Sequence, residues 1–273
     1  MLEIVRSGAS APKARVAILD FDGTLSLIRS GWMQVMIPLC VEVLAKTNSG
    51  ESDDQLRVVA EDFVWRLTGK ETIYQMMALA EGVASRGGKP LEPIAYKRLY
   101  LERLSKRIAG RLQALDSGAA APEQYLVPGS RALLEALLAR GLTLFLASGT
   151  DDADVKREAA LLDIAKYFDG RVYGAQDDLT SFSKALLVRK LAGEAGHSGD
   201  ELLVFGDGYV EIEEVKKVGG TAVGVASAEP ECREVDEWKR QRLIQVGADF
   251  IVPNFENFEE ILSAVLVASP VAL

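Results

Sequence analysis

The second half of the chain alternates regularly between apolar runs and segments with helical spacing of apolar residues. This alternation constrains the fold more than any other feature, because strands that alternate with helices form a parallel sheet covered on both faces. We expect strands at 142–147, near Val172, and at 202–205, 221–225 and 249–252, and helices at 128–141, 151–162, 184–195, 211–218, 238–246 and 258–267. The predicted class is therefore α/β, with a Rossmann-like, doubly wound parallel sheet.

A further strand is expected at Val16–Leu19, far from the others in the sequence. Its four residues are all apolar, as in a strand that is buried on both faces of a parallel sheet. We therefore place it in the same sheet. The first dozen residues show no such pattern, and we expect them to form a loose terminal arm.

Residues 26–125 show a different rhythm, with helical periodicity and no convincing strand. We expect helices at 32–46, 54–67, 72–85 and 94–115. An all-helical block inserted directly after the first strand of an α/β sheet is best interpreted as a cap domain over the catalytic edge. The predicted organisation is a core domain of residues 1–25 and 126–273, with a helical cap domain at 26–125.

The charge of the chain limits its partners. Its 273 residues carry a net charge of −9, which argues against nucleic acid as a partner because phosphate backbones bind basic faces. A small anionic substrate remains compatible with this charge, since local lysines, backbone amides and a metal ion can outweigh it.

The cysteines and the histidine argue against a metal or redox cysteine site and against a histidine-dependent triad. Cys40 and Cys232 are far apart and in no metal or redox spacing, so we expect reduced thiols. The single His197 lies in a Gly-Ser context typical of a surface loop, which disfavours a histidine-dependent triad.

No apolar run suits a membrane span or a signal peptide, so we expect a cytoplasmic protein without membrane contact. The absence of an apolar surface stripe favours a monomer or a weak homodimer.

Two carboxylates directly follow the first strand. Asp20 and Asp22 are two residues apart, so on an extended chain their side chains share a face, and Gly23-Thr24 supplies the turn. Ligands of open α/β sheets bind at this carboxyl edge. Two carboxylates so close repel each other unless a cation or a proton neutralises one of them.

Three other segments are expected near the same edge. Ser148, Gly149 and Thr150 end a strand just before a helix, where a hydroxyl and free amides bind anions. Lys184 begins a helix and can supply a point charge. Asp207 and Glu211 follow the strand at 202–205. Three carboxylates, a cation and a hydroxyl suit a hard, oxygen-ligated cation such as Mg²⁺.

These four segments, in this order, resemble the signature motifs of the haloacid dehalogenase superfamily. The resemblance covers residues from about 15 to 252 and is closest to phosphatases with a helical cap, including phosphoglycolate phosphatase and β-phosphoglucomutase-like members. The first motif, Asp20-Phe21-Asp22-Gly23-Thr24-Leu25, is highly specific. The others are short, and their order and placement make them informative.

The resemblance implies roles for the two leading carboxylates and for a metal. Asp20 would attack phosphorus to form an aspartyl phosphate, and Asp22 would act as general acid and then as general base. Mg²⁺ would be held by Asp20, by the backbone carbonyl of Asp22 and by Asp207. Glu211 stands where the family more often has a second aspartate, so we expect it to hold the metal through water or directly.

The resemblance also implies the residues that would hold the phosphoryl group. Ser148 and the amide of Gly149 would bind phosphoryl oxygens, and Lys184 would balance charge between Asp20 and the phosphoryl group. Thr24 would order the phosphate-binding loop. Because a halide leaving group needs no proton, the acidic residue at position 22 favours phosphoryl transfer over dehalogenation.

The leading hypothesis is a Mg²⁺-dependent phosphatase acting on a small phosphorylated metabolite, such as a sugar phosphate or a phosphoglycolate-like compound. A phosphomutase, a phosphonate-cleaving enzyme and a non-catalytic module that binds a phosphorylated ligand remain open. Lys70, in a turn between two predicted cap helices, is the candidate for a Schiff base or for a contact with the leaving group. The charged segment 229–242 is expected to be a solvated helix, or to bring Trp238, Lys239 or Arg240 to the site or to a partner subunit.

Overall fold

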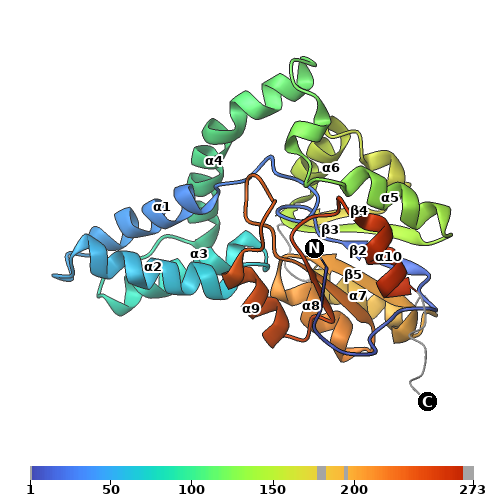
Figure 1. Cartoon of the computed structure of the whole chain (residues 1–273). Coiled ribbons are helices and arrows are strands. Elements are labelled where there is room, and N and C mark those ends of the chain that lie inside the picture. Colours follow the sequence, from blue (N-terminus) through green and yellow to red (C-terminus); the bar gives the residue numbers. More distant parts are fainter. Residues whose placement is uncertain (1, 177–182, 194–195, 267–273) are drawn as a thin grey trace. The chain divides into compact units, whose positions relative to one another are not determined.

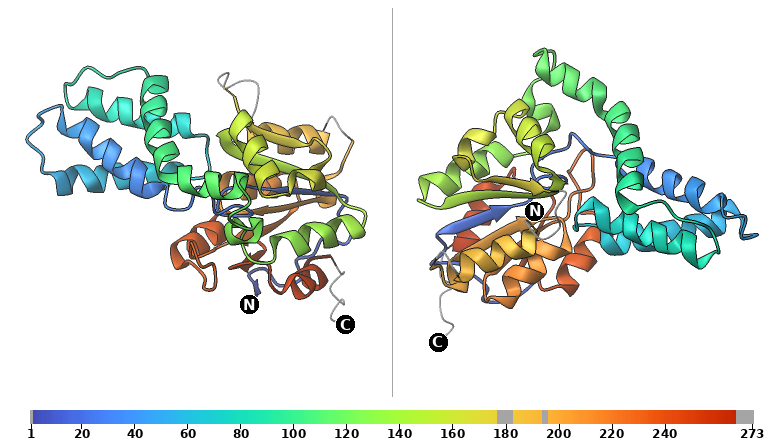
Figure 2. Two further views of the ribbon diagram at one scale, coloured as in Figure 1. Left: turned by 90° about the horizontal axis from the view of Figure 1, so that it is seen from above. Right: turned by 180° about the vertical axis from the view of Figure 1, so that it is seen from behind.

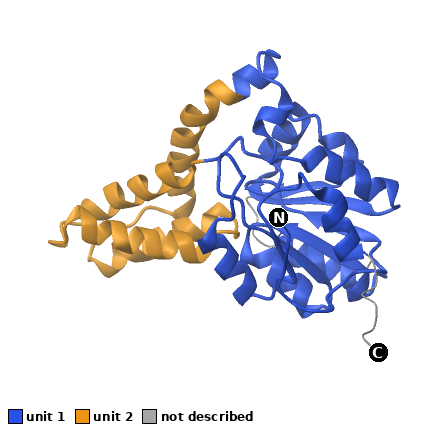
Figure 3. Cartoon of the chain, viewed as in Figure 1, with its two compact units in different colours: residues 1–30, 112–273 blue, residues 31–111 orange. Residues whose placement is uncertain are grey.

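The computed structural model describes residues 2–176, 183–193 and 196–266. It separates into two compact units (Figure 3). One unit contains residues 1–30 and 112–273, and the other contains residues 31–111.

The α/β unit is built on a sheet of seven strands in the order β1-β7-β6-β5-β2-β3-β4 (Figure 1). Neighbouring strands are parallel except for the pair β1 and β7. The parallel α/β architecture predicted from the sequence is therefore confirmed. The strands are β1 (Glu3–Ile4), β2 (Val16–Leu19), β3 (Thr143–Asp151), β4 (Val172–Ala175), β5 (Leu202–Gly206), β6 (Thr221–Val225) and β7 (Phe250–Val252).

Helices cover both faces of this sheet. Figures 1 and 2 show α7 and α8 on one face, and α5 and α10 on the other. This is the doubly wound arrangement that the alternating sequence predicts. The helices of the unit are α5 (Ser130–Ala139), α6 (Asp152–Leu161), α7 (Lys184–Gly193), α8 (Tyr209–Lys217), α9 (Glu237–Gln245) and α10 (Phe258–Leu266).

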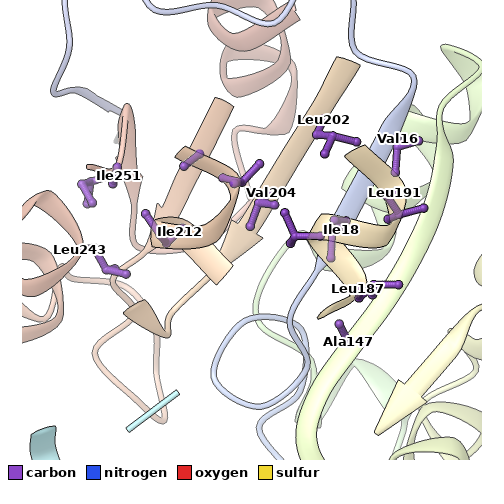
Figure 4. Close-up of a cluster of buried hydrophobic side chains, with 14 of the residues drawn as sticks. Val16, Ile18, Ala147, Leu187, Leu191, Leu202, Val204, Ile212, Leu243 and Ile251 are labelled. Atoms are coloured by element: carbon purple, nitrogen blue, oxygen red, sulfur yellow. The ribbon is translucent and has the colours of Figure 1, made fainter. Parts of the chain in front are cut away.

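Strand β2 is central, paired with β3 on one side and β5 on the other. Val16 and Ile18 are buried in the apolar cluster that includes Leu187 of α7 and Ile212 of α8 (Figure 4). Their neighbours Ala17 and Leu19, which alternation directs to the other face, are fully buried as well. Burial on both faces explains the unbroken apolar sequence of this strand. The carboxyl end of β2 consequently lies between the ends of β3 and β5.

The N-terminal residues are not the loose arm expected from the sequence. Glu3 and Ile4 form β1, which pairs antiparallel with β7 at one edge of the sheet. The Glu3 carboxylate is also within 2.6 Å of the Arg240 guanidinium of α9. Backbone pairing with an exposed edge requires no apolar pattern, which is why a two-residue strand escaped sequence analysis.

The second unit, residues 31–111, is helical, as its sequence predicts. Its helices α1 (Met33–Ala45), α2 (Asp53–Leu67) and α3 (Thr72–Ser85) are followed by α4 (Pro93–Asp116), which continues into the α/β unit. Ser52 and Gln55 form a capping box at the start of α2, which satisfies amides that the helix leaves free. None of the described helices has the length and apolar character needed to cross a membrane. Both cysteines of the chain are unpaired and buried.

Candidate active site

The loops after β2 and β5 and the last residues of β3 carry most of the predicted site residues. Asp20 and Asp22 follow β2, and Asp207 follows β5. Strand β3 was expected to end at residue 147, but it continues to Asp151 after an irregularity in its pairing with β4. Ser148 and Thr150 therefore belong to this irregular strand end and not to a loop.

Asp20 is held by a cation and by an amide. Its Oδ1 atom lies 2.7 Å from Lys184 Nζ and accepts a hydrogen bond of 2.7 Å from the Phe21 amide. Both side chains of the ion pair are almost fully buried. Within the described part of the chain, these polar contacts all fall on Oδ1, and this leaves Oδ2 as the oxygen available for a ligand or for nucleophilic attack.

Glu211 also contacts Lys184, the lysine that pairs with Asp20. Its Oε2 atom lies 3.1 Å from Lys184 Nζ, and its Oε1 atom accepts a hydrogen bond of 2.9 Å from the Gly208 amide at the start of α8. The carboxylate passes directly over Gly206, where a β-carbon would lie 2.2 Å from Oε1. Glycine at this position is thus a steric requirement of the Glu211 conformation.

Asp22 has surroundings unlike those of Asp20. Its Oδ2 atom accepts a hydrogen bond of 2.7 Å from the Thr150 hydroxyl, and the Ser148 hydroxyl lies at 3.4 Å. Its Oδ1 atom is buried and has no hydrogen-bond partner among the described residues. Hydroxyl contacts leave Asp22 able to exist as either the acid or the carboxylate.

The pKa shifts follow from these contacts. Burial raises the pKa of Asp22, and the nearby charge of Arg29 and the Thr150 hydrogen bond only partly oppose this effect. Burial also raises the pKa of Asp20, against the charge of Lys184. For Lys184, burial by itself would lower the pKa, but the charges of Asp20 and Glu211 outweigh it and raise the pKa above its ordinary value. Lys184 is therefore an ammonium at neutral pH.

Thr24 joins the loops that follow β2 and β5. Its buried hydroxyl accepts a hydrogen bond of 3.0 Å from the Asp207 amide. Next to it, Gly23 has a φ of +76°, and a β-carbon there would lie 2.3 Å from Asp207 Oδ2. The turn thus brings the Asp207 carboxylate against the backbone of the Asp20 loop.

A group of carboxylates could hold a metal ion at this point. Asp20, Asp207 and Glu211 each offer an oxygen, and the three oxygens lie within 4.8 Å of one another. Convergent carboxylate oxygens of this kind suit a hard cation such as Mg²⁺. Glu211 already has a partner for each oxygen, so Asp20 and Asp207 are the members best able to accept a cation.

Lys70 belongs to the helical unit. It lies in the turn between α2 and α3, and its ammonium is 5.2 Å from the centroid of the Tyr74 ring. The sequence analysis placed it in such a turn. Gly149 lies in β3 between the two residues whose hydroxyls approach Asp22.

Several residues that contact this site or act on it through their charge were not assigned from the sequence. Thr150 was part of a recognised segment, yet its hydroxyl makes the shortest hydrogen bond to Asp22. Arg29 forms a buried ion pair with Glu158 and raises the positive potential at Asp22. From the unexplained charged segment, Lys239 reaches Asp207 at 2.9 Å. Thr150 and Lys239 thus lay in segments that the sequence had marked, whereas no sequence signal pointed to Arg29.

A comparison with protein families gives a match over most of the chain. The family model described as haloacid dehalogenase-like hydrolase matches residues 14–219. No significant match to the chain is found among curated proteins.

Solved structures show the same fold at low sequence identity. A predicted phosphoglycolate phosphatase from Haemophilus somnus 129PT has 17% identity and a TM-score of 0.54, over 91% of this chain and 98% of that one. A phosphonoacetaldehyde hydrolase-like protein from Oleispira antarctica has 19% identity and a TM-score of 0.58, over 94% of each chain. A HAD family hydrolase from Deinococcus radiodurans R1, solved with bound phosphate and sodium, has 14% identity and a TM-score of 0.55, over 96% of this chain and 100% of that one.

Proposed function

Because the chain belongs to the haloacid dehalogenase-like hydrolase family, we propose that it is a Mg²⁺-dependent phosphatase acting on a small phosphorylated metabolite. The observation that carries the proposal is the difference between two neighbouring carboxylates. Asp20 contacts an ammonium at 2.7 Å, whereas Asp22 accepts its shortest hydrogen bond from a hydroxyl, also at 2.7 Å. Burial raises the pKa of both carboxylates, but only Asp20 has a cation in direct contact to stabilise its anion, which suits Asp20 as the nucleophile and Asp22 as the proton donor.

In the proposed first step, Asp20 attacks the phosphorus atom in line with the leaving group. The bond between phosphorus and the ester oxygen breaks as the bond to the Asp20 carboxylate forms. Asp22 donates its proton to the departing oxygen, so the product leaves as a neutral alcohol. The raised pKa of Asp22 supports this role, because an acid must hold its proton near neutral pH.

In the second step, Asp22 accepts a proton from water as the water attacks the aspartyl phosphate. The bond between phosphorus and the Asp20 oxygen then breaks, which releases phosphate and restores the Asp20 carboxylate. Lys184 offsets the negative charge on Asp20 and on the phosphoryl group, and Glu211 keeps the ammonium in place. Ser148 and the Gly149 amide are proposed to bind phosphoryl oxygens.

Asp20, Asp207 and the backbone carbonyl of Asp22 would hold Mg²⁺, with Glu211 nearby to hold an associated water. When bound, the ion would neutralise charge that otherwise keeps an anionic phosphate away from an anionic nucleophile. Thr24 positions Asp207 for this purpose through the Asp207 amide.

The helical unit is proposed to act as the cap that selects the leaving group. In the sequence, residues 31–111 follow shortly after the loop that carries Asp20 and Asp22. Lys70 is our candidate for a contact with the leaving group. We also propose a cytoplasmic protein, a monomer or weak homodimer, with a sugar phosphate or phosphoglycolate-like compound as its substrate.

The test is phosphate release from a panel of phosphorylated metabolites, with and without Mg²⁺. We expect release that depends on Mg²⁺, is abolished in Asp20→Asn, and is strongly reduced in Asp22→Asn. Arg240→Gln, a charge change on α9 away from these residues, serves as the control. Absence of release from every ester would refute the phosphatase.

The same panel separates the other reactions of the fold. Conversion of a sugar phosphate into its isomer without phosphate release would identify a phosphomutase. Cleavage of a phosphonate, lost in Lys70→Met, would identify a phosphonate hydrolase with a Schiff base. Binding of a phosphorylated compound without any turnover would identify a binding module.

A further inference from the structure

The segment between β6 and α9 is folded against the candidate metal ligands. The Ser227 hydroxyl donates a hydrogen bond of 2.9 Å to the carbonyl oxygen of Gly23, in the turn that follows Asp22. Farther along, Asp236 caps α9 by accepting a hydrogen bond of 2.9 Å from the Lys239 amide. Both ends of the segment are therefore anchored, one to the catalytic loop and one to a helix start.

This segment brings the carboxylate of Glu229 to Asp207, and the first turn of α9 brings the ammonium of Lys239. Lys239 Nζ lies 2.9 Å from Asp207 Oδ2 and 2.8 Å from Glu229 Oε1. The three side chains are mostly buried, with exposed fractions of 12% for Lys239, 14% for Asp207 and 19% for Glu229. The ammonium thus bridges two carboxylates in a place that solvent reaches only in part.

The bridge lies where a metal ion would compete for the same oxygen. Asp207 shares the group of three convergent carboxylate oxygens with Asp20 and Glu211. A β-carbon on Gly23 would lie 2.3 Å from Asp207 Oδ2 and 3.0 Å from Glu229 Oε1, so both atoms lie over the same turn. A divalent ion on Asp207 and an ammonium on the same carboxylate oppose each other.

We propose that Lys239 is a tethered cation that competes with the metal for Asp207, and that Glu229 takes over the ammonium when the metal binds. Lys239 is therefore a positioning residue that sets metal affinity. This inference rests on the metal site of the proposed function. Because Glu229 remains at 2.8 Å, the ammonium keeps a partner after it gives up Asp207.

The neighbouring residue on α9 provides a contrast. Arg240 forms ion pairs with Glu3 at 2.6 Å and with Glu237 at 2.8 Å, neither of which belongs to the carboxylate group around Asp20. Two adjacent cations of one helix therefore have different partners, and only one of them contacts a candidate metal ligand. Arg240→Gln is for this reason a matched control for loss of charge.

The experiment measures Mg²⁺ binding to the full chain by titration calorimetry, without substrate. Lys239→Met should bind Mg²⁺ at least about tenfold more tightly, because an opposing charge a few ångströms away is removed. Glu229→Gln should bind it more weakly, because the ammonium then has Asp207 as its main partner. Arg240→Gln should leave the affinity unchanged.

Thermal unfolding gives a second readout. In a chelator, Lys239→Met should have a lower Tm than the wild type, because Asp207 and Glu229 then repel each other. Its Tm should rise more on addition of Mg²⁺. Lys239→Arg keeps the charge and is expected to resemble the wild type. If Lys239→Met does not fold, the weaker binding expected for Glu229→Gln decides the question.

Unchanged or weaker Mg²⁺ binding by folded Lys239→Met, or unchanged binding by Glu229→Gln, would overturn the inference. These outcomes differ from failure of the proposed function. If the protein hydrolyses phosphate esters with Mg²⁺ but its affinity for Mg²⁺ is unchanged in Lys239→Met, only the inference is refuted. Opposite affinity changes in the two variants, without hydrolysis of any ester, refute only the phosphatase.

Discussion

The buried ion pair between Arg29 and Glu158 provides the sharpest test of how charge is balanced beside the site. Arg29 Nη2 lies 2.7 Å from Glu158 Oε1, and Arg29 Nε donates a hydrogen bond of 3.1 Å to Oε2. The exposed fractions of the two side chains are 8% and 0%. The substitution Arg29→Met removes the cation, keeps much of the side-chain volume and leaves Glu158 without its main partner.

The loss of stability in Arg29→Met follows from the protonation of a buried glutamate that has lost its cation. In the variant, Glu158 is expected to take up a proton, because burial already raises its pKa in the wild type. Protonating a group whose ordinary pKa is 4.5 at pH 7 costs about 3 kcal/mol, since each pKa unit is about 1.4 kcal/mol. This figure agrees with the roughly 3–5 kcal/mol found when one partner of a buried pair is removed.

The same reasoning fixes the sign of the pH dependence. In the variant, folded Glu158 stays protonated while unfolded Glu158 loses its proton above its ordinary pKa. The destabilisation relative to the wild type should therefore be about 3 kcal/mol at pH 7 and fall to about 1 kcal/mol at pH 5. Arg29→Met combined with Glu158→Gln has no such proton and should recover most of the loss at pH 7.

Urea unfolding of the three proteins, followed by circular dichroism at pH 5 and pH 7, measures these differences. A loss that is the same at both pH values would show that Glu158 does not take up the proton. Failure of Glu158→Gln to rescue Arg29→Met would show that Arg29 acts through other contacts. Either result would refute the argument from an uncompensated buried carboxylate.

Two further variants test the geometry around the proposed nucleophile and acid. In Thr150→Val, Asp22 loses a hydrogen bond that lowers its pKa. The alkaline limb of the pH profile of kcat should therefore move to higher pH, and kcat should fall by about tenfold. An unchanged pH profile would contradict the role of this hydroxyl. In Gly206→Ala, the new β-carbon would overlap Glu211 Oε1, so Glu211 and Lys184 must shift, and the Tm and kcat should both fall, with a stability loss of about 1–3 kcal/mol. Wild-type values in Gly206→Ala would show that the Glu211 conformation is not required.

The strands and the leading carboxylates could be predicted because their signals are local. A strand buried on both faces must be apolar throughout, and Val16–Leu19 shows this directly. Asp20 and Asp22 share an edge because of strand geometry, and Asp207 follows the neighbouring strand β5. The ends of parallel strands meet at one edge of a sheet, so placing both strands in one parallel sheet is enough to bring these carboxylates to the same edge.

The rest depends on contacts between distant segments that no local pattern records. β1 forms through backbone pairing, so neither of its residues needed to be apolar. Thr150 contacts Asp22 because β3 continues past its apolar run in an irregular form. Lys239 reaches Asp207 because the segment after β6 is anchored at both ends, and the sequence indicated only an unexplained run of charge.

The contacts of Thr150 and Lys239 both involve carboxylates of an acidic site. Asp20, Asp22 and Asp207 gather at one sheet edge, and a protein interior tolerates such a group only if each charge meets a cation, a proton or a donor. Lys184 offsets the charge of Asp20, and Lys239 offsets the charge of Asp207. Asp22 accepts hydrogen bonds from hydroxyls and has a raised pKa. Each of the two ammonium groups has a second carboxylate partner, Glu211 for Lys184 and Glu229 for Lys239, so neither is left unpaired when a divalent cation takes Asp20 or Asp207. A divalent cation can therefore bind Asp20 and Asp207 together without leaving a buried ammonium unpaired, and this charge balance supports the proposed metal site.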